Sequence, residues 1–139
     1  MAKQNTGYSS TPLSKKLGFK DFDKVIVLNQ PLYYWDLMEG ILPEILTAHP
    51  DENDVHFVHI FVKTMDELET LVLKYRDQIQ QNGMIWVSWP KKSSKIPTEI
   101  TEDTIRDFAL ANGLVDVKVC AIDEIWSGLK LVIPLKLRK

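Results

Sequence analysis

Three short runs of almost uninterrupted apolar residues, separated by helical patterns, place the strongest constraint on how this chain folds. The runs are KVIVLN at Lys24–Asn29, DVHFVHIFV at Asp54–Val62 and MIWVSW at Met84–Trp89. A strand that is apolar at consecutive positions is buried on both faces, as the strands of a parallel sheet are. The sequence therefore predicts a buried sheet with helices on both sides.

Helix signals separate the apolar runs. Thr11 and Pro12 are typical of a helix start, and Gly18 is typical of the left-handed position at its end. After Pro31, the segment YYWDLMEGIL predicts a helix, because its apolar residues are three and four positions apart: Tyr34, Leu37, Met38 and Ile41. The segment Pro43–Pro50 fits either a helix end or a short strand.

Two further helices are predicted in the second half of the chain. Thr64 and Glu67 form a capping box at the start of the first, and Asn82-Gly83 is its expected end. The second runs from about Thr101 to Asn112. The apolar face of the first consists of Leu68, Leu71, Val72, Tyr75 and Ile79.

The last two strands alternate apolar and polar residues, which is typical of strands near the edge of a sheet. They are Val115–Ile122 and a strand containing Leu129, Leu131 and Ile133. The connection Asp123–Gly128 is too short for a parallel crossover, so the final strand is expected to run antiparallel to its neighbour. We expect one edge of the sheet to be exposed near Leu129–Ile133.

The order of elements predicts right-handed crossovers between parallel strands. The predicted fold class is α/β, a three-layer α/β/α Rossmann-like sandwich whose sheet is mostly parallel with an antiparallel C-terminal edge strand. With 139 residues and a mass of 16.0 kDa, the chain is expected to form a single Rossmann-like domain over residues 1–139.

Composition excludes several functional classes. A net charge of −2 and a pI near 5.9 argue against a nucleic-acid coat and against a polybasic membrane binder. The single cysteine, Cys120, excludes an internal disulfide framework and a cysteine-built metal site. Residues 1–20 carry four lysines but no apolar core of signal-peptide length, and no apolar run approaches a membrane span, so a cytoplasmic location is expected.

Ligands of open α/β sheets bind beyond the carboxyl ends of the parallel strands. Lysines there could hold a phosphate or carboxylate as point charges, and tryptophans could stack on a flat ring. The predicted ligand-binding residues at this rim are Asn29, Lys63, Trp89, Lys91, Lys92, Asp123 and Trp126.

No catalytic residue, metal ligand or cofactor is assigned from the sequence. The segment NQPLYYW stands where a dinucleotide-binding loop would need glycines, and the P-loop, GxSxG and HExxH patterns are absent. His56 and His59 are three positions apart on a strand, which favours a buried, hydrogen-bonded histidine over a metal pair. Ser88 lacks a matched base, and Cys120 is expected to be an inert buried thiol.

Asp123 and Glu124 are adjacent acids near the rim. One of them could act as a general base, but a role as polar residues of a tight hairpin is favoured.

Three strings resemble an uncharacterised bacterial family, the domain of unknown function number 3052. They are GYSSTPLSKKLGFK, GMIWVSWPKK and GLVDVKVCAIDEIWSGLKLV. The resemblance implies a small bacterial cytoplasmic protein and transfers no activity. More distantly, the parallel sheet that ends in a hairpin and an antiparallel strand is similar to the C-terminal half of class I methyltransferases. Those enzymes carry a glycine-rich loop after their first strand and an acid after their second.

Three functional hypotheses follow from these observations. The first is a binding domain with a small anionic ligand at the rim. The alternatives are a reduced S-adenosylmethionine-dependent methyltransferase-like enzyme and a protein-interaction module that uses the exposed edge strand. A membrane partner is not expected, and nucleic-acid binding is disfavoured by the net charge.

Overall fold

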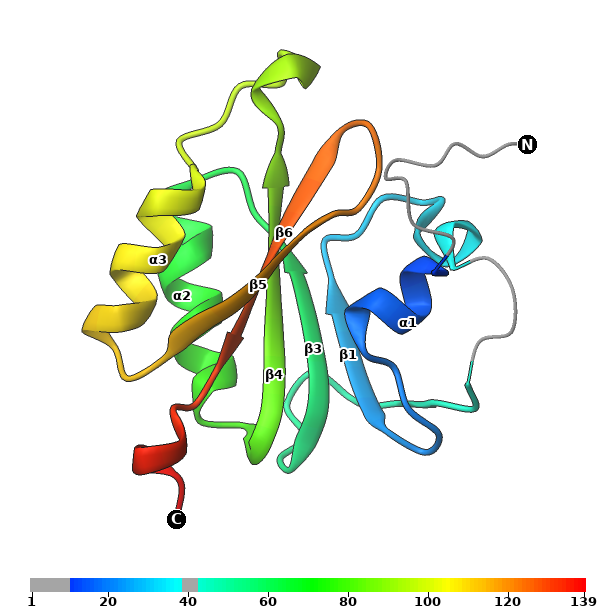
Figure 1. Ribbon diagram of the computed structural model, residues 1–139, viewed down its shortest axis with the longest axis vertical. Coiled ribbons are helices and arrows are strands. Elements are labelled where there is room, and N and C mark those ends of the chain that lie inside the picture. The colour runs from blue at the N-terminus through cyan, green and yellow to red at the C-terminus, as the bar shows by residue number, and fades with distance from the viewer. Residues whose placement is uncertain (1–10, 39–42) are drawn as a thin grey trace.

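The computed structural model describes residues 11–38 and 43–139. A six-stranded sheet runs through the middle of the molecule, with the strand order β2-β1-β3-β4-β6-β5 (Figure 1). Its strands are β1 (Lys24–Leu28), β2 (Leu46–Thr47), β3 (Val55–Phe61), β4 (Ile79–Pro90), β5 (Val115–Ala121) and β6 (Trp126–Val132).

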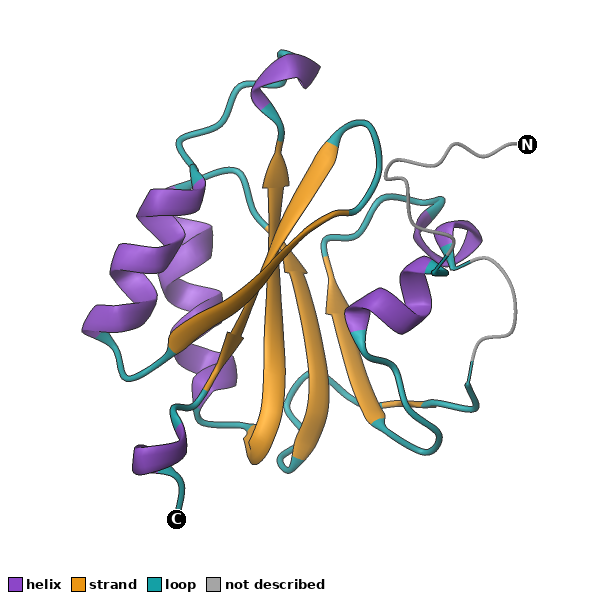
Figure 2. Cartoon of the chain, in the orientation of Figure 1, coloured by secondary structure: helices purple, strands orange, loops and turns teal. Residues whose placement is uncertain are grey.

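Helices cover both faces of this sheet (Figure 2). On one face lie α2 (Met65–Arg76) and α3 (Glu102–Ala111), and on the other lie α1 (Leu13–Leu17) and the 3₁₀ turn η1 (Tyr34–Leu37). Two further 3₁₀ turns are η2 (Lys92–Ser94) and η3 (Leu135–Leu137). The predicted three-layer α/β/α arrangement is confirmed.

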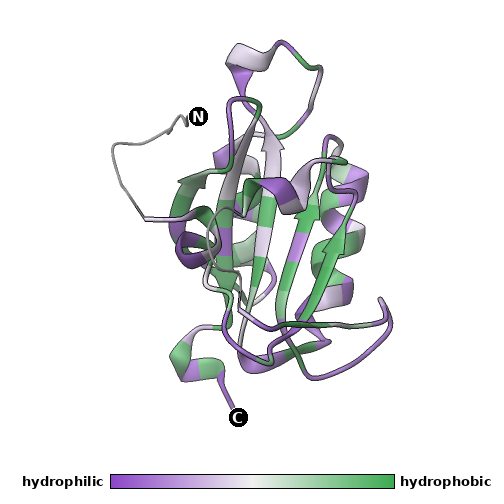
Figure 3. Ribbon diagram, turned by 90° about the vertical axis from the view of Figure 1, so that its right-hand side faces the viewer, coloured by the Kyte–Doolittle hydropathy of each residue, from purple (hydrophilic) through white to green (hydrophobic). Residues whose placement is uncertain are grey.

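Each face of the sheet has its own apolar core. Leu68, Val72 and Ile105 on the helices pack against one face, together with strand residues such as Ile60 and Val87. The opposite core contains Leu17, Phe19, Tyr34, Phe57, Trp86 and Trp126. The hydrophobic colour in Figure 3 accordingly concentrates on the strands, while the connecting loops are mostly hydrophilic.

Both long helices begin at a capping box. The Thr64 hydroxyl accepts the N–H of Glu67, whose carboxylate accepts the N–H of Thr64 in return, so the predicted start of α2 is confirmed. Thr101 and Thr104 exchange the same pair of bonds at the start of α3. These bonds occupy N–H groups that a helix leaves without partners in its first turn.

The predicted end of α2 at Asn82-Gly83 is wrong. The helix ends at Arg76, and β4 begins at Ile79, which lies opposite Val55 of β3. Gly83 is therefore a strand residue, and a Cβ there would lie 3.0 Å from the carbonyl oxygen of Val55. Close approach of two strand backbones, rather than a turn, explains this glycine.

The helix predicted after Pro31 is also wrong over its described part. Only the single 3₁₀ turn η1 forms, with Met38 at its end, while Ile41 lies outside the described residues. The ambiguous segment that follows contains a strand, since β2 pairs with the first two residues of β1 in parallel.

The final strand β6 runs antiparallel, as its short connection predicts, but it is not itself the edge. It pairs with β4 on one side and β5 on the other, so the prediction of an exposed edge near Leu129–Ile133 is wrong. The edge is β5, whose residues Val117, Lys118 and Val119 are exposed. β6 has fewer charged residues than β5, which suits the strand that is paired on both sides.

Over the described parts of the chain, no helix is both long enough and apolar enough to span a membrane.

The capping box of α2 supplies a direct test of this local account. We expect Thr64→Ala to lower the free energy of unfolding by about 1 kcal/mol, because the N–H of Glu67 loses its partner. Chemical denaturation measures the change. Thr70→Ala, at an exposed position inside the same helix, is the control and should be neutral or slightly stabilising. Equal losses in the two variants would contradict the capping role.

Candidate functional site

The structure brings the predicted residues to one end of the sheet, the rim at which the parallel strands β1, β3 and β4 terminate. Because β6 runs antiparallel, its start lies beside the end of β4, with Trp126 opposite Pro90. The seven residues all lie at or next to these strand ends: Asn29, Lys63, Trp89, Lys91, Lys92, Asp123 and Trp126.

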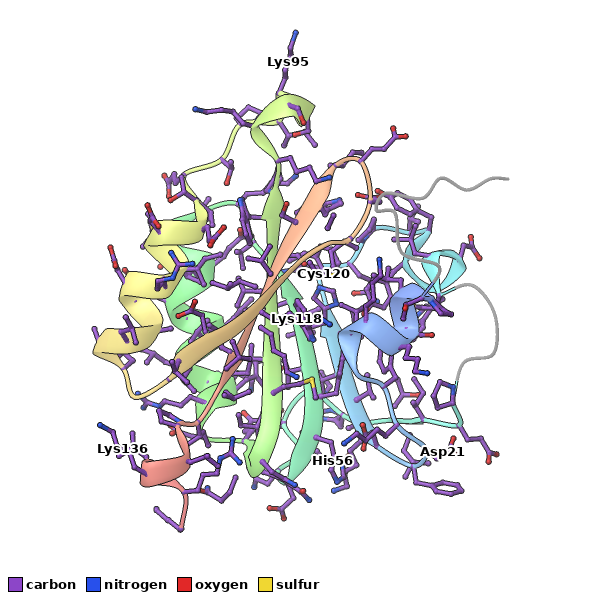
Figure 4. All side chains as sticks on the ribbon, viewed as in Figure 1. Asp21, His56, Lys95, Lys118, Cys120 and Lys136 are labelled. Carbon is purple, nitrogen blue, oxygen red and sulfur yellow. The ribbon has the colours of Figure 1, made fainter. Side chains whose placement is uncertain are left out.

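The three predicted lysines extend from the ends of the neighbouring strands β3 and β4. The carbonyl of Lys63 accepts the N–H of Glu99 and the hydroxyl of Thr98, both at 2.9 Å. The N–H of Lys91 donates to the carbonyl of Ile125 at 2.7 Å. These bonds tie the loop that carries Lys92 to β3 at one end and to the β5–β6 hairpin at the other. Lys95, in the same loop, points away at the tip (Figure 4).

Carboxylates at the rim are already engaged by backbone groups. Glu67 accepts the N–H groups of Lys63 and Thr64, and Glu99 accepts the N–H of Met65 at 2.7 Å. The N–H groups of Thr64, Met65 and Glu67 at the start of α2 are thus occupied from within the chain. Within the described residues, the ammonium groups of Lys63, Lys91 and Lys92 form no ion pair. An incoming anion would therefore meet lysines rather than a free helix end.

The two tryptophans of the predicted site lie on opposite faces of the sheet. Trp89 is 9% exposed and packs into the core beneath α2 and α3. Trp126 is 8% exposed and packs edge-on against Phe61 in the other core, with ring centroids 5.0 Å apart. The structure does not bring the two indoles together as walls of one mouth.

Asp123 anchors the hairpin, in agreement with the structural role favoured by the sequence. Its Oδ1 accepts the N–H groups of Ile125 and Trp126, both at 2.8 Å. It also faces Tyr33, which the sequence did not single out. Burial, followed by a hydrogen bond to Asp123 and the charge of that carboxylate, raises the pKa of Tyr33 to about 12. The segment after β1 therefore reaches across to the hairpin.

Asn29 closes the end of β1. It adopts a left-handed backbone conformation, with φ of 62°, and its side-chain amide donates to the carbonyl of Phe61 at 3.4 Å. Asparagine tolerates this conformation better than most residues. In this arrangement the amide binds β3.

A chain of three polar side chains lies buried beneath the rim. His59 lies between the Tyr34 hydroxyl, 2.8 Å from its Nδ1, and the Ser88 hydroxyl, 2.7 Å from its Nε2. All three side chains are 0% exposed. A neutral imidazole has one donor and one acceptor, so the two hydroxyls take complementary roles. The prediction of a buried, hydrogen-bonded histidine is confirmed.

Burial determines the protonation states of these hydrogen-bonded side chains. It lowers the pKa of His59 to about 3 and raises the pKa of Tyr34 well above its usual range, so both groups are neutral at neutral pH. Ser88 does have a histidine beside it, which the sequence could not show, because the two residues are 29 positions apart. A serine with no exposed surface cannot reach a substrate, so we assign it a structural role.

Within the described residues, the histidines do not form a metal site. His56 accepts the N–H of Lys24 through Nδ1 at 2.9 Å, so it is engaged separately from His59. Among the residues that the structure describes, no group of three or more His, Cys, Asp and Glu side chains could hold a metal ion. Burial also raises the pKa of the Cys120 thiol, which favours the unreactive protonated form.

The two positions at which class I methyltransferases grip their cofactor differ here. The segment after β1 carries Tyr33 and Tyr34, whose side chains pack onto the hairpin and His59, in place of glycines. The strand β2 has only two residues, beside the start of β1, and the chain then turns back. Asp51, which follows β2, pairs with Lys74 near the end of α2, away from the rim. These residues do not fit S-adenosylmethionine.

Residues 37–135 match a family model described as a protein of unknown function, DUF3052. The match spans more than half of the chain. The chain belongs to the DUF3052 family. The comparison with curated proteins gives no match.

Solved structures identify the fold of this DUF3052 protein. A SAM-dependent methyltransferase from Aquifex aeolicus is 12% identical, with a TM-score of 0.62 over 88% of both chains. The magnesium protoporphyrin IX methyltransferase of Synechocystis is 12% identical, with a TM-score of 0.52 over 82% of this chain and 71% of that one.

A third similar structure is the fibrillarin pre-rRNA processing protein of Methanococcus jannaschii. It is 9% identical, with a TM-score of 0.51 over 91% of this chain and 70% of that one. At such low identities these likenesses show the fold alone, which is the predicted Rossmann-like, methyltransferase-like α/β fold.

The buried histidine predicts a specific dependence of stability on pH. Unfolded His59 takes up a proton below about pH 6.5, whereas folded His59 stays neutral down to a pH of about 3. Its stabilising contribution is therefore complete above pH 6.5 and is lost as the pH falls through that window. We expect the free energy of unfolding of the wild type to fall, relative to His59→Gln, by up to about 1.4 kcal/mol per pH unit.

Urea denaturation between pH 7 and pH 4 measures this difference. A constant difference between the wild type and His59→Gln across this range would show that folded His59 protonates freely.

Proposed function

We propose that this protein is a non-catalytic binding domain that takes an anionic ligand at the carboxyl rim of its sheet. Lys91 and Lys92 bind the anionic group, and Lys63 contributes a third positive charge from the neighbouring strand. Asn29, Asp123 and Trp126 shape the rim on the hairpin side, and Trp89 supports it from below.

One observation carries this proposal. Lys63, Lys91 and Lys92 lie at adjacent strand ends that backbone hydrogen bonds hold in place, and the nearby carboxylates of Glu67 and Glu99 already cap α2. Lys63 and Lys92 are exposed, and Lys91 is partly so. Lysines with no ion pair among the described residues, on a rigid base, are suited to a phosphate or a carboxylate.

The similarity to a SAM-dependent methyltransferase from Aquifex aeolicus supports the alternative of a reduced methyltransferase. The residues after β1 and β2 favour the binding domain over that alternative. Tyr33 and Tyr34 are packed where a cofactor loop would need glycines, and Asp51 lies away from the rim with Lys74.

An NMR titration with inorganic pyrophosphate tests the proposal residue by residue. We expect the backbone amides of Lys63, Ser93 and Ser94 to shift, and we expect the shifts to be lost in Lys91→Ala/Lys92→Ala. The matched control is Lys15→Ala/Lys136→Ala, which removes two exposed lysines elsewhere. It has the same net charge as Lys91→Ala/Lys92→Ala. The control should behave as the wild type does.

Rim amides that stay still with pyrophosphate, or that move equally in both double variants, would refute the proposal. A parallel titration with S-adenosylhomocysteine is expected to leave the amides of Gln30, Tyr33 and Tyr34 unmoved. Saturable shifts there would instead support the methyltransferase-like alternative.

A further inference from the structure

A second group of lysines lies on a different surface, the face of β5 and β6 on the α1 side. Lys118 of β5 and Lys130 of β6 are directly opposite each other in the sheet register. Like charges directly opposite on neighbouring strands destabilise a sheet. Lys130 also lies opposite Trp86, in the middle of β4 and away from the rim.

An irregularity in β5 removes the acid that would otherwise neutralise this pair. In a regular strand Asp116 and Lys118 would lie on the same face. The register shifts between them, so Asp116 lies opposite Leu131 on the α3 side and binds Arg106 at 3.0 Å. Lys118 is left on the α1 side without that carboxylate.

Two more lysines approach from the N-terminal part of the chain. The ammonium of Lys118 donates to the carbonyl of Lys16 in α1 at 2.9 Å, which places the two residues side by side. Lys20 follows α1. Burial, and then the charges of Lys118 and Lys20, lower the pKa of Lys130. Lys16, Lys20, Lys118 and Lys130 are called the sheet-face lysines below.

No carboxylate among the described residues forms an ion pair with a sheet-face lysine. Asp23 comes nearest in sequence, and its Oδ2 accepts the backbone N–H of Lys20 at 3.2 Å. The floor beneath the cluster is apolar and closed, since Trp86 is 0% exposed and Cys120 is 8% exposed. Lys118 and Lys20 are exposed, while Lys130 is half-buried.

We propose that the sheet-face lysines form a second binding site, one that takes a phosphate-bearing ligand with two adjacent phosphoryl groups. Lys118 and Lys130 bind the first phosphoryl group between them, and Lys16 and Lys20 bind the second from the α1 side. This site is separate from the rim and does not depend on the function proposed there.

The arrangement fits this ligand class on charge and on spacing. The Cβ atoms of residues opposite each other on antiparallel strands lie about 5 Å apart, so two lysine side chains can converge on one phosphoryl group. Four cations match the charge of a diphosphate better than that of a single phosphate. Bound anions would relieve the repulsion between Lys118 and Lys130, which the free protein must bear.

Titration with inorganic pyrophosphate, followed by NMR, also tests this site. We expect the amides of Lys20, Lys118 and Lys130 to shift, with an affinity at least about tenfold higher than for inorganic phosphate at matched ionic strength. Lys118→Gln/Lys130→Gln should lose the response, measured at Lys20 and Cys120. Lys91→Ala/Lys92→Ala should retain it, so failure of the rim and failure of this site can be told apart.

Thermal unfolding supplies a second measurement. The expected result is a higher melting temperature, whereas a folding defect would lower it. Without anions, Lys130→Gln is expected to raise the melting temperature, because it removes one of two opposed charges. In the Lys91→Ala/Lys92→Ala background, which removes the lysines proposed to bind pyrophosphate at the rim, pyrophosphate should still raise the melting temperature, and adding Lys130→Gln should remove almost all of that rise. Equal pyrophosphate responses in the two proteins, or equal affinities for phosphate and pyrophosphate, would overturn the proposal.

Discussion

The hydrogen bonds of His59 to Tyr34 and Ser88 determine how the rest of this structure is arranged. They join the segment after β1 to the two central strands, β3 and β4, inside a core with no access to water. A buried imidazole that loses either partner leaves a polar group unsatisfied, at a cost of about 1–3 kcal/mol. The chain after β1 is therefore held against the sheet by polar bonds as well as by apolar contacts.

This closure explains how a methyltransferase-like fold can lack the grip on a nucleoside cofactor. Tyr33 and Tyr34 pack over the end of β1, and the short β2 turns back before it reaches the rim. In the binding function that we propose, recognition at that end of the sheet is by charge, supplied by lysines beyond β3 and β4. On that proposal the same fold serves a different kind of ligand, in line with the rule that function depends on the site rather than on the fold.

Much of the fold could be predicted from the sequence, because continuous apolar runs and capping residues act locally. The start of α2 at Thr64 and the three central strands are examples. The sequence pattern predicts the wrong role for Gly83, because that role depends on a contact with Val55, far away in the chain. The expected strand ends place the rim lysines at one end of the sheet. They do not show that Trp89 and Trp126 lie on opposite faces, because the face of each side chain depends on strand register. The sheet-face lysines could not be predicted, because one irregularity in β5 separates Lys118 from Asp116.

The central claim is that a neutral His59 closes the end of β1, and nitrogen NMR of its imidazole tests this claim most directly. At pH 5 an ordinary histidine is mostly protonated. The account predicts that His59 still shows one protonated and one unprotonated ring nitrogen at that pH. A His59 ring with both nitrogens protonated at pH 5 in the folded protein would contradict the account.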